Sequence, residues 1–235
     1  HNTYPGAACD IASHLYCYSF EPNPNWSRKF SPQPEIQSYI EHCADKYDVR
    51  RHVQLNTEVQ SFSFDEARGL WVAHLPGDQT LAAHHVIFAT GGLHLPAFPD
   101  IPGMGNFRGP AMHSAQWDHS VDFDNKRVAV IGSAASAIQL IPEVAKVAAH
   151  VDVYQRTPNY IAPRNDRKFR AWEKALFARL PWLGKLYRQW LFLRGELLLF
   201  PIVKTKGRSR VRNAAERMVR RNINSSVKDP ATREA

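Results

Sequence analysis

The apolar residues near the start of the chain recur at a helical period. In residues 34–47, Ile36, Tyr39, Ile40 and Cys43 are spaced so that one face of a helix would carry them. Pro34 suits a first helical turn, where a backbone N–H has no partner to lose. The pattern predicts an amphipathic helix over this stretch.

The period then changes to the alternation that is typical of strands. Residues 52–65, 70–75 and 80–90 carry β-branched and aromatic side chains, and the sequence PGDQ joins the last two. We therefore predict β-strands here, with a turn at PGDQ. This β-rich part ends at Gly91 and Gly92.

The middle of the chain combines an irregular connection with a repeat of strand, helix and strand. Residues 93–109 contain too many prolines and glycines for a helix or a central strand, which indicates an extended connection at a domain boundary. After it, the pattern predicts a buried strand at 127–132, a helix at 133–148 and a second strand at 150–156. Pro142 could kink the helix.

The last third of the chain is rich in Trp, Leu and Arg and predicts helices. They cover residues 171–180, 182–200 and 204–221, and the last is strongly basic on one face. A solvated helix face explains that charge better than a nucleic-acid site does, because no nucleic-acid motif accompanies it. Four aromatic residues in the second helix form either a binding surface or packing against a neighbouring domain: Trp182, Tyr187, Trp190 and Phe192.

Composition excludes several classes of protein. The chain has 235 residues, of which 44% are hydrophobic, so it can bury a core, and its net charge is +8. The longest apolar run, 197–203, is too short for a transmembrane helix and contains a proline. Three cysteines without a paired spacing favour a reducing, cytoplasmic setting. The histidines and aspartates near residue 118 fit no helical zinc motif, so no metal site is predicted.

The predicted strand-helix-strand unit carries a candidate nucleotide-binding turn. Gly132, Ala134 and Ala137 stand at the positions of the three glycines of G-x-G-x-x-G/A. A pyrophosphate would then lie on the helix N-terminus, where free N–H groups and the helix dipole favour an anion. The predicted contact residues are Gly132, Ser133, Ala134, Ala135, Ser136 and Ala137.

The end of the second strand indicates which nucleotide would bind. Arg156 and Thr157 stand where a site specific for NAD usually carries Asp or Glu. A guanidinium there would pair with a 2′-phosphate, so the sequence favours NADP(H) over NAD(H).

The stretch FRGPAMHSAQWD carries the most specific signal. Phe107, Gly109, His113, Trp117 and Asp118 match the pattern F-x-G-x-x-x-H-x-x-x-W-P/D, which identifies Baeyer-Villiger monooxygenases within the flavin-containing monooxygenase superfamily. The sequence YPGAACD also resembles that family's Y-P-G-x-x-x-D signature. The chain thus resembles a flavin-dependent monooxygenase of the Baeyer-Villiger type over essentially its whole length.

The resemblance implies a fold, cofactors and roles for single residues. The fold is an α/β flavoprotein with two dinucleotide-binding domains, Rossmann-like and three-layered, with a helical insertion. Asp10, His113 and Trp117 would serve catalysis, with His113 acting in domain positioning. Asp10 would lie near the flavin and nicotinamide, although a residue after PG is usually a turn or cap residue. FAD and NADP(H) would also contact Ala8, Cys9, Tyr16, Val59, Ala89, Thr90 and Gly91. Without the resemblance, Tyr16 would be assigned to the core.

The resemblance also implies an internal fragment with four parts. They are a partial FAD-binding domain (1–100), a connection with the fingerprint (101–125), an NADP-binding Rossmann unit (126–165) and a helical region of the NADP domain (166–235). The glycine turn for FAD is expected before Tyr4, and an arginine that stabilises the anionic peroxyflavin is expected after the last residue. Truncated in this way at both ends, the fragment is expected to be inactive alone.

The reaction implied for the parent enzyme is oxygen insertion. NADPH would reduce FAD, O2 would form a C4a-peroxyflavin, and one oxygen would enter a ketone or aldehyde. Two alternatives stay open, namely an enzyme that oxygenates nitrogen or sulfur and a nucleotide-binding module without turnover. The expected partners are a small-molecule substrate (ketone, aldehyde or sulfide) and O2, without nucleic acid.

Overall fold

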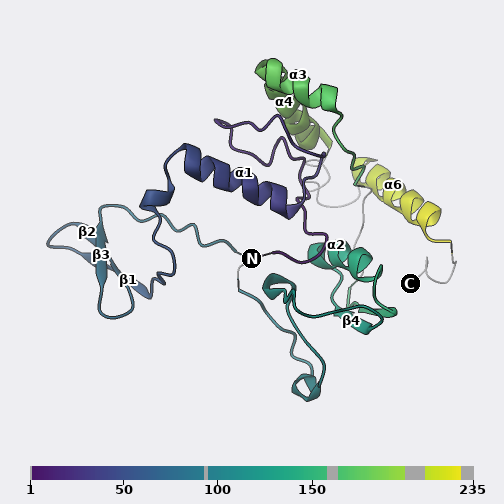
Figure 1. Cartoon of the computed structure of the whole chain (residues 1–235), viewed down its shortest axis with the longest axis horizontal. Helices are drawn as coiled ribbons and strands as arrows, with labels where there is room; N and C mark the ends of the chain where they lie inside the picture. Colours follow the sequence, from purple (N-terminus) through teal and green to yellow (C-terminus); the bar gives the residue numbers. More distant parts are fainter. Residues whose placement is uncertain (1, 93–94, 158–163, 199–209, 229–235) are drawn as a thin grey trace.

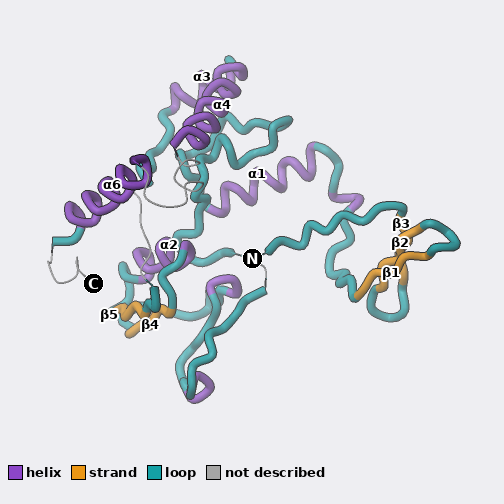
Figure 2. The backbone as a smooth tube through the Cα atoms, turned by 180° about the vertical axis from the view of Figure 1, so that it is seen from behind, coloured by secondary structure: helices purple, strands orange, loops and turns teal. Residues whose placement is uncertain are grey.

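The computed structural model describes residues 2–92, 95–157, 164–198 and 210–228. Helices, a small antiparallel sheet and a parallel strand pair alternate with long loops (Figure 2). The principal elements in chain order are α1 Gln33–Lys46, β1 Ser61–Asp65, β2 Leu70–His74, β3 Thr80–Ala83, β4 Arg127–Ile131, α2 Ala135–Val144, β5 His150–Tyr154, α3 Ala171–Arg179, α4 Pro181–Leu198 and α6 Arg210–Ser226.

The strands β1, β2 and β3 form an antiparallel sheet that projects away from the helices (Figure 1). Ser61 pairs with His74 at one end of the first ladder, and Thr80 pairs with the same histidine in the second. The helix predicted at residues 34–47 is confirmed as α1, and the turn at PGDQ is also confirmed. The predicted strands were too long. Residues 52–60 and 84–90 are not strands. Gln60 donates to the carbonyl oxygen of His74 in β2 at 2.9 Å, but the ladder does not extend further over these residues in the described part of the chain.

The predicted strand-helix-strand unit is confirmed. β4 and β5 are parallel, with Arg127 opposite His150 and Ile131 opposite Tyr154, and α2 connects them. The helix continues past Pro142 and ends at Val144. Within the predicted connection, residues 95–109 are irregular as predicted, apart from the short 3-10 turn Met104–Asn106, and residues 93–94 lie outside the described residues.

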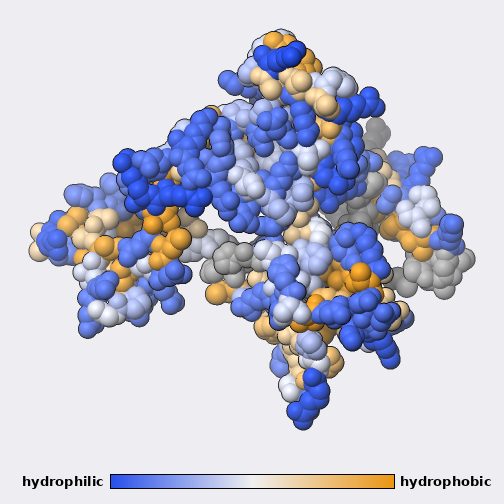
Figure 3. Space-filling model, viewed as in Figure 1, coloured by the Kyte–Doolittle hydropathy of each residue, from blue (hydrophilic) through white to orange (hydrophobic). Residues whose placement is uncertain are grey.

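The helices of the last third are confirmed within the described residues. Residues 199–200 and 204–209 of the predicted helices lie outside them, and α6 continues beyond its predicted end to Ser226. Hydrophobic side chains gather on the surface of the three-stranded sheet and around α3 and α4 (Figure 3). No helix in the described part of the chain combines the length and the apolar character needed to cross a membrane.

A first core cluster, here called the α2 cluster, joins the start of the chain to the parallel unit. Tyr4, Ala7, Leu140 and Val144 are buried together. Half-buried residues of the connection, of both parallel strands and of the segment between α2 and β5 pack against them, namely Trp117, Phe123, Val128, Ala148 and Val151. Residues more than 130 positions apart in the sequence thus share one core.

Gly6 makes this contact possible. Its φ of +80° lies in the left-handed region, and a Cβ there would stand 2.4 Å from the carbonyl oxygen of Gln139 in α2. A side chain would therefore be strained and would also push the loop away from the helix.

We expect Gly6→Ala to lower the free energy of unfolding by about 3 kcal/mol, because backbone strain and a backbone clash add together. Gly77→Ala is the matched control. Gly77 has a φ of +73° but open space around its Cβ position, so only strain, about 1 kcal/mol, is expected. Denaturant unfolding of both variants measures the difference, and equal losses would contradict the close approach at Gly6.

A second cluster, the aromatic cluster, attaches α3 and α4 to the N-terminal part. Trp26, Tyr39, Cys43 and Phe169 are buried, and Cys17, Ile36, Phe177 and Tyr187 pack around them. His14 lies at its centre, with its ring centroid 5.0 Å from the rings of Phe169, Phe177 and Tyr187. Arg188 of α4 donates to the carbonyl oxygens of His14 at 2.8 Å and Cys17 at 3.0 Å.

The imidazole of His14 is held in its neutral form. Its Nε2 is buried and has no hydrogen-bond partner. Burial, assisted by the positive charge of Arg188, lowers the pKa of His14 from 6.5 to about 4. Protonation of the ring is therefore opposed by the folded state.

Acid should consequently weaken the aromatic cluster. Since the pKa of His14 is lower in the folded chain than in the unfolded chain, its stabilising effect is complete above pH 6.5 and is lost as the pH falls towards 4. We expect this histidine to account for a loss of about 2–3 kcal/mol in the free energy of unfolding between pH 7 and pH 4.5. Urea unfolding of wild type and His14→Phe at both pH values measures it. An identical pH dependence in the two proteins would refute the assignment.

Candidate functional site

The turn after β4 has the features of a nucleotide-binding turn. Gly132 has a φ of +108°, and a Cβ at this position would meet no atom within 4 Å. Its amide donates to the carbonyl oxygen of Tyr154, which ties the turn to the end of β5 at 2.8 Å. The backbone can therefore approach a ligand closely at this point.

The N-terminus of α2 follows this turn directly. Ala134 is the N-cap residue, and no side chain caps the first turn of α2. The first N–H groups of a helix have no partner within the helix, so those of Ala135, Ser136 and Ala137 are the donors that an anion at this helix end would meet. The residues predicted from the glycine pattern thus form one continuous surface.

Arg156 and Thr157 are exposed just beyond the end of β5. Parallel strands end at the same edge of their sheet, and Ile131 is paired with Tyr154 at that edge. The topology therefore brings Arg156 to the edge where Gly132 makes its turn.

The fingerprint stretch folds tightly around Gly109. A Cβ at Gly109 would lie 2.8 Å from Cζ of the exposed Phe107 ring, so a side chain at this position would require the ring to shift.

His113 and Trp117 have clear structural partners. The Nδ1 atom of His113 accepts a hydrogen bond of 3.1 Å from the amide of Ala115, and its ring packs edge-on against Phe98. A neutral ring that accepts at Nδ1 carries its proton on Nε2. The ring of Trp117 stacks on Phe123 at 5.3 Å and belongs to the periphery of the α2 cluster.

Asp118 closes the fingerprint with a local turn. Its Oδ1 accepts hydrogen bonds from the amide and the hydroxyl of Ser120, at 2.8 and 2.6 Å. These bonds lower the pKa of Asp118, so the side chain is a carboxylate at neutral pH. Its observed role is to shape the loop after Trp117.

The loop that carries Asp10 is held on several sides. Cys9 is buried and its amide donates to the carbonyl oxygen of Ser31, while burial raises the pKa of its thiol. Ser13 is fully buried, and its hydroxyl bonds that of Ser31 at 2.8 Å. The side chains of Asp10 and Tyr16 remain exposed, so the assignment of Tyr16 to the core is wrong for this structure.

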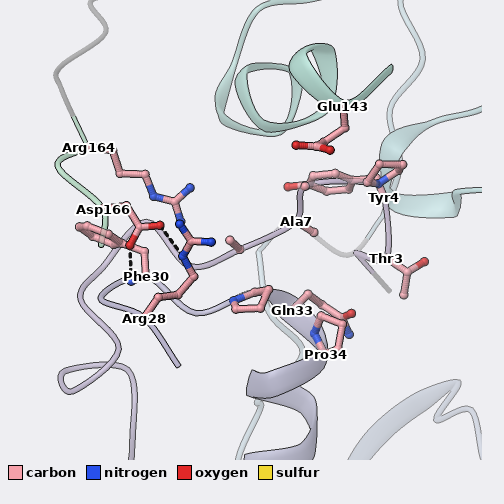
Figure 4. A pocket seen from close by; sticks show the side chains of 14 residues that line it. Thr3, Tyr4, Ala7, Arg28, Phe30, Gln33, Pro34, Glu143, Arg164 and Asp166 are labelled. Atoms are coloured by element: carbon pink, nitrogen blue, oxygen red, sulfur yellow. Dashed lines mark hydrogen bonds and ion pairs between the residues drawn. The ribbon is translucent and has the colours of Figure 1, made fainter. Parts of the chain in front are cut away.

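A cavity of about 480 Å³ lies between this loop, α1 and α2 (Figure 4). Thr3 borders it on one side, and Glu143 of α2 points into it. Ala8 also belongs to its lining. On the other side Arg28 pairs with Asp166 at 2.7 Å. Its lining combines the charged side chains of Arg28, Glu143 and Asp166 with apolar residues such as Phe30 and Pro34.

The other residues predicted to contact FAD are spread out. Val59, Ala89, Thr90 and Gly91 are exposed and lie in the coils on either side of the three-stranded sheet. Asp10 and Tyr16, by contrast, share one loop beside the aromatic cluster. The residues predicted for the flavin thus lie on separate segments, whereas the residues predicted for the glycine turn are consecutive in the chain.

Sequence reasoning missed two residues that organise the site, Gln139 and Arg164. Gln139 bonds the hydroxyl of Tyr4 and the backbone of Ala8, and Arg164 bonds the carbonyl of Cys9. The signal for Gln139 was present, because it is a polar side chain between the apolar residues Ile138 and Leu140 of the helix. Nothing in the sequence near Arg164 distinguishes it from a surface arginine.

Comparison with known proteins agrees with this geometry. A Baeyer-Villiger monooxygenase of Pseudomonas aeruginosa is 43% identical over 234 residues, which are 99% of this chain and 44% of that protein. The structure of an oxidized steroid monooxygenase bound to NADP has a TM-score of 0.81 at 33% identity, covering 99% of this chain and 51% of the other. A structure of OTEMO with FAD and NADP has a TM-score of 0.80 at 29% identity, covering 99% and 52%.

The chain therefore spans about half the length of the proteins it matches. The family model described as flavin-binding monooxygenase-like matches residues 2–190. The chain belongs to the flavin-binding monooxygenase-like family.

Proposed function

We propose that the protein to which this chain belongs is an FAD- and NADPH-dependent monooxygenase that inserts one atom of O2 into a ketone or aldehyde. The observation that carries this proposal is the fingerprint of Phe107, Gly109, His113 and Trp117, in which His113 orders a tight turn and Trp117 packs against the α2 cluster. The names of the similar proteins, a Baeyer-Villiger monooxygenase and a steroid monooxygenase, support the same reaction.

The described residues fit NADP(H). Gly132 gives the backbone an open approach, and the uncapped first turn of α2 offers N–H donors to the pyrophosphate. Arg156 supplies the positive charge for the 2′-phosphate, since its guanidinium is exposed at the same edge. In the proposal, β4, α2 and β5 are part of a three-layer NADP domain that includes the helical region.

The residues present fit FAD only in part. Among the helices that the structure describes, α2 alone follows a strand through a glycine turn, and it is assigned to NADP(H). Asp10, Tyr16, Val59 and the segment Ala89–Gly91 would form one side of the flavin site, with Ala8 and Cys9 on the nicotinamide side. When bound, the flavin supplies the activation of O2.

The protein's own residues would orient the reactants. Asp10 is exposed on a loop whose neighbours are buried and hydrogen-bonded, so its carboxylate is presented from a rigid base. His113 and Trp117 would position the connection between the two nucleotide domains, because one orders a tight turn and the other packs against the α2 cluster. The division into four parts at residues 100, 125 and 165 belongs to this proposal.

The cofactor assignment is tested by Arg156→Ala. Loss of the guanidinium should raise the KM for NADPH on the order of tenfold and leave the KM for NADH within about twofold, because only NADPH has the 2′-phosphate. Arg127→Ala is the control, since Arg127 is exposed at the opposite end of the parallel strands. Steady-state kinetics with both nucleotides measures the effect, and equal changes would overturn the assignment.

The reaction class is tested on the whole protein with a panel of ketones, aldehydes and sulfides. We expect O2-dependent consumption of NADPH coupled to formation of an ester or lactone, detected by mass spectrometry with an ¹⁸O label from O2. Turnover of sulfides alone would favour the sulfur-oxygenating alternative. Absence of O2-dependent NADPH consumption with every compound would refute the enzymatic proposal.

A further inference from the structure

The backbone N–H and C=O groups of Ala8 are both hydrogen-bonded to a side chain of α2. Gln139 accepts from the amide of Ala8 at 3.3 Å through Oε1 and donates to the carbonyl oxygen of Ala8 at 3.0 Å through Nε2. Its Oε1 also accepts from the hydroxyl of Tyr4 at 3.0 Å. A single carboxamide thus satisfies both backbone groups of Ala8 and the side chain of Tyr4.

The next residue is held from the opposite side. Arg164 donates from Nη2 to the carbonyl oxygen of Cys9 at 2.8 Å, and its guanidinium lies 5.0 Å from the ring centroid of Phe30. Arg164, which is labelled in Figure 4, follows β5 in the chain, whereas Gln139 of α2 precedes β5. Two side chains from the parallel unit and the segment after it therefore hold Ala8 and Cys9.

Neither residue is part of the turn at Gly132. Gln139 lies one helical turn beyond Ala135, and its carboxamide is directed to the N-terminal loop by the three hydrogen bonds. The close approach of Gly6 to the carbonyl of Gln139 brings the loop to this distance. The contact is polar, directional and partly buried, which distinguishes it from the apolar packing of the α2 cluster.

We propose that Gln139 and Arg164 are positioning residues that fix Ala8, Cys9 and Asp10 relative to the nucleotide-binding turn. The proposal rests on the proposed function, in which this loop borders the nicotinamide and the flavin. Transfer of a hydride between two bound cofactors depends steeply on their separation and orientation. Loosening the loop should therefore slow reduction of the flavin without weakening the binding of the nucleotide.

The main test is Gln139→Met in the whole protein, because Met preserves the length and volume of the side chain and removes all three hydrogen bonds. Hydrogen exchange followed by mass spectrometry should show exchange on the order of tenfold faster in the peptide containing residues 4–10. Gln37→Met is the matched control. Gln37 is exposed on α1 and its side chain bonds only the neighbouring Gln33 and Glu41, so the same peptide should be unchanged.

Arg164→Met provides a second variant at an exposed position, in case the first disturbs folding. In both variants we expect flavin reduction by saturating NADPH to slow on the order of tenfold, while the Kd for NADP+ stays within about threefold. Arg68→Met, in the turn between β1 and β2, controls for loss of an exposed arginine.

The outcomes separate this inference from the proposed function. Unchanged hydrogen exchange in residues 4–10 in both variants would show that Gln139 and Arg164 do not hold this loop. Faster exchange with an unchanged rate of flavin reduction would overturn the positioning role of the two residues. A parallel rise in the Kd for NADP+ would also overturn it, because the residues would then act in nucleotide binding. A wild-type protein whose flavin NADPH does not reduce would refute the proposed function itself, and with it the positioning role.

Discussion

The contact between the N-terminal loop and α2 is the constraint on which the rest of the site depends. It joins residues 4–8 to residues 139–144, so the chain must close a loop of more than 130 residues to form it. Closing a long loop has an entropic cost that increases only slowly with length, and the burial of Tyr4, Leu140 and Val144 offsets it. Gly6 permits the approach, and the carboxamide of Gln139 fixes the register of the two segments.

The two core clusters stabilise different parts of the chain. The α2 cluster connects the loop, the fingerprint and the parallel strands, whereas the aromatic cluster connects α1, α3 and α4. Residues 27–30 also pair with residues 166–169 through backbone hydrogen bonds and the ion pair of Arg28 with Asp166. Because the loop of Asp10 runs between these attachments, it can be exposed and still have a defined backbone.

Local sequence patterns predicted the regular elements well. They did not predict where the strands end, because that depends on pairing with other segments of the chain. The helix at residues 33–46 and the strand-helix-strand unit follow from periodicity that each segment carries by itself. The strand expected at 80–90 ends at Ala83, because the next residues, including Ile87 with 88% exposure, have no described strand to pair with. Apolar character alone does not distinguish such a segment from a paired strand.

The same reasoning applies to the candidate site. Gly132 and Arg156 could be predicted as one site because parallel strands end at one edge, which is a rule of topology. Gln139 and Arg164 could not, because their importance lies in which backbone groups they meet, and those groups belong to residues 131 and 155 positions away. A carboxamide in an apolar helix indicates a buried polar partner but not its identity. Residues that link two distant parts of a chain are therefore difficult to identify from the sequence around them. Residues predicted to contact a ligand, by contrast, can follow a recognisable pattern.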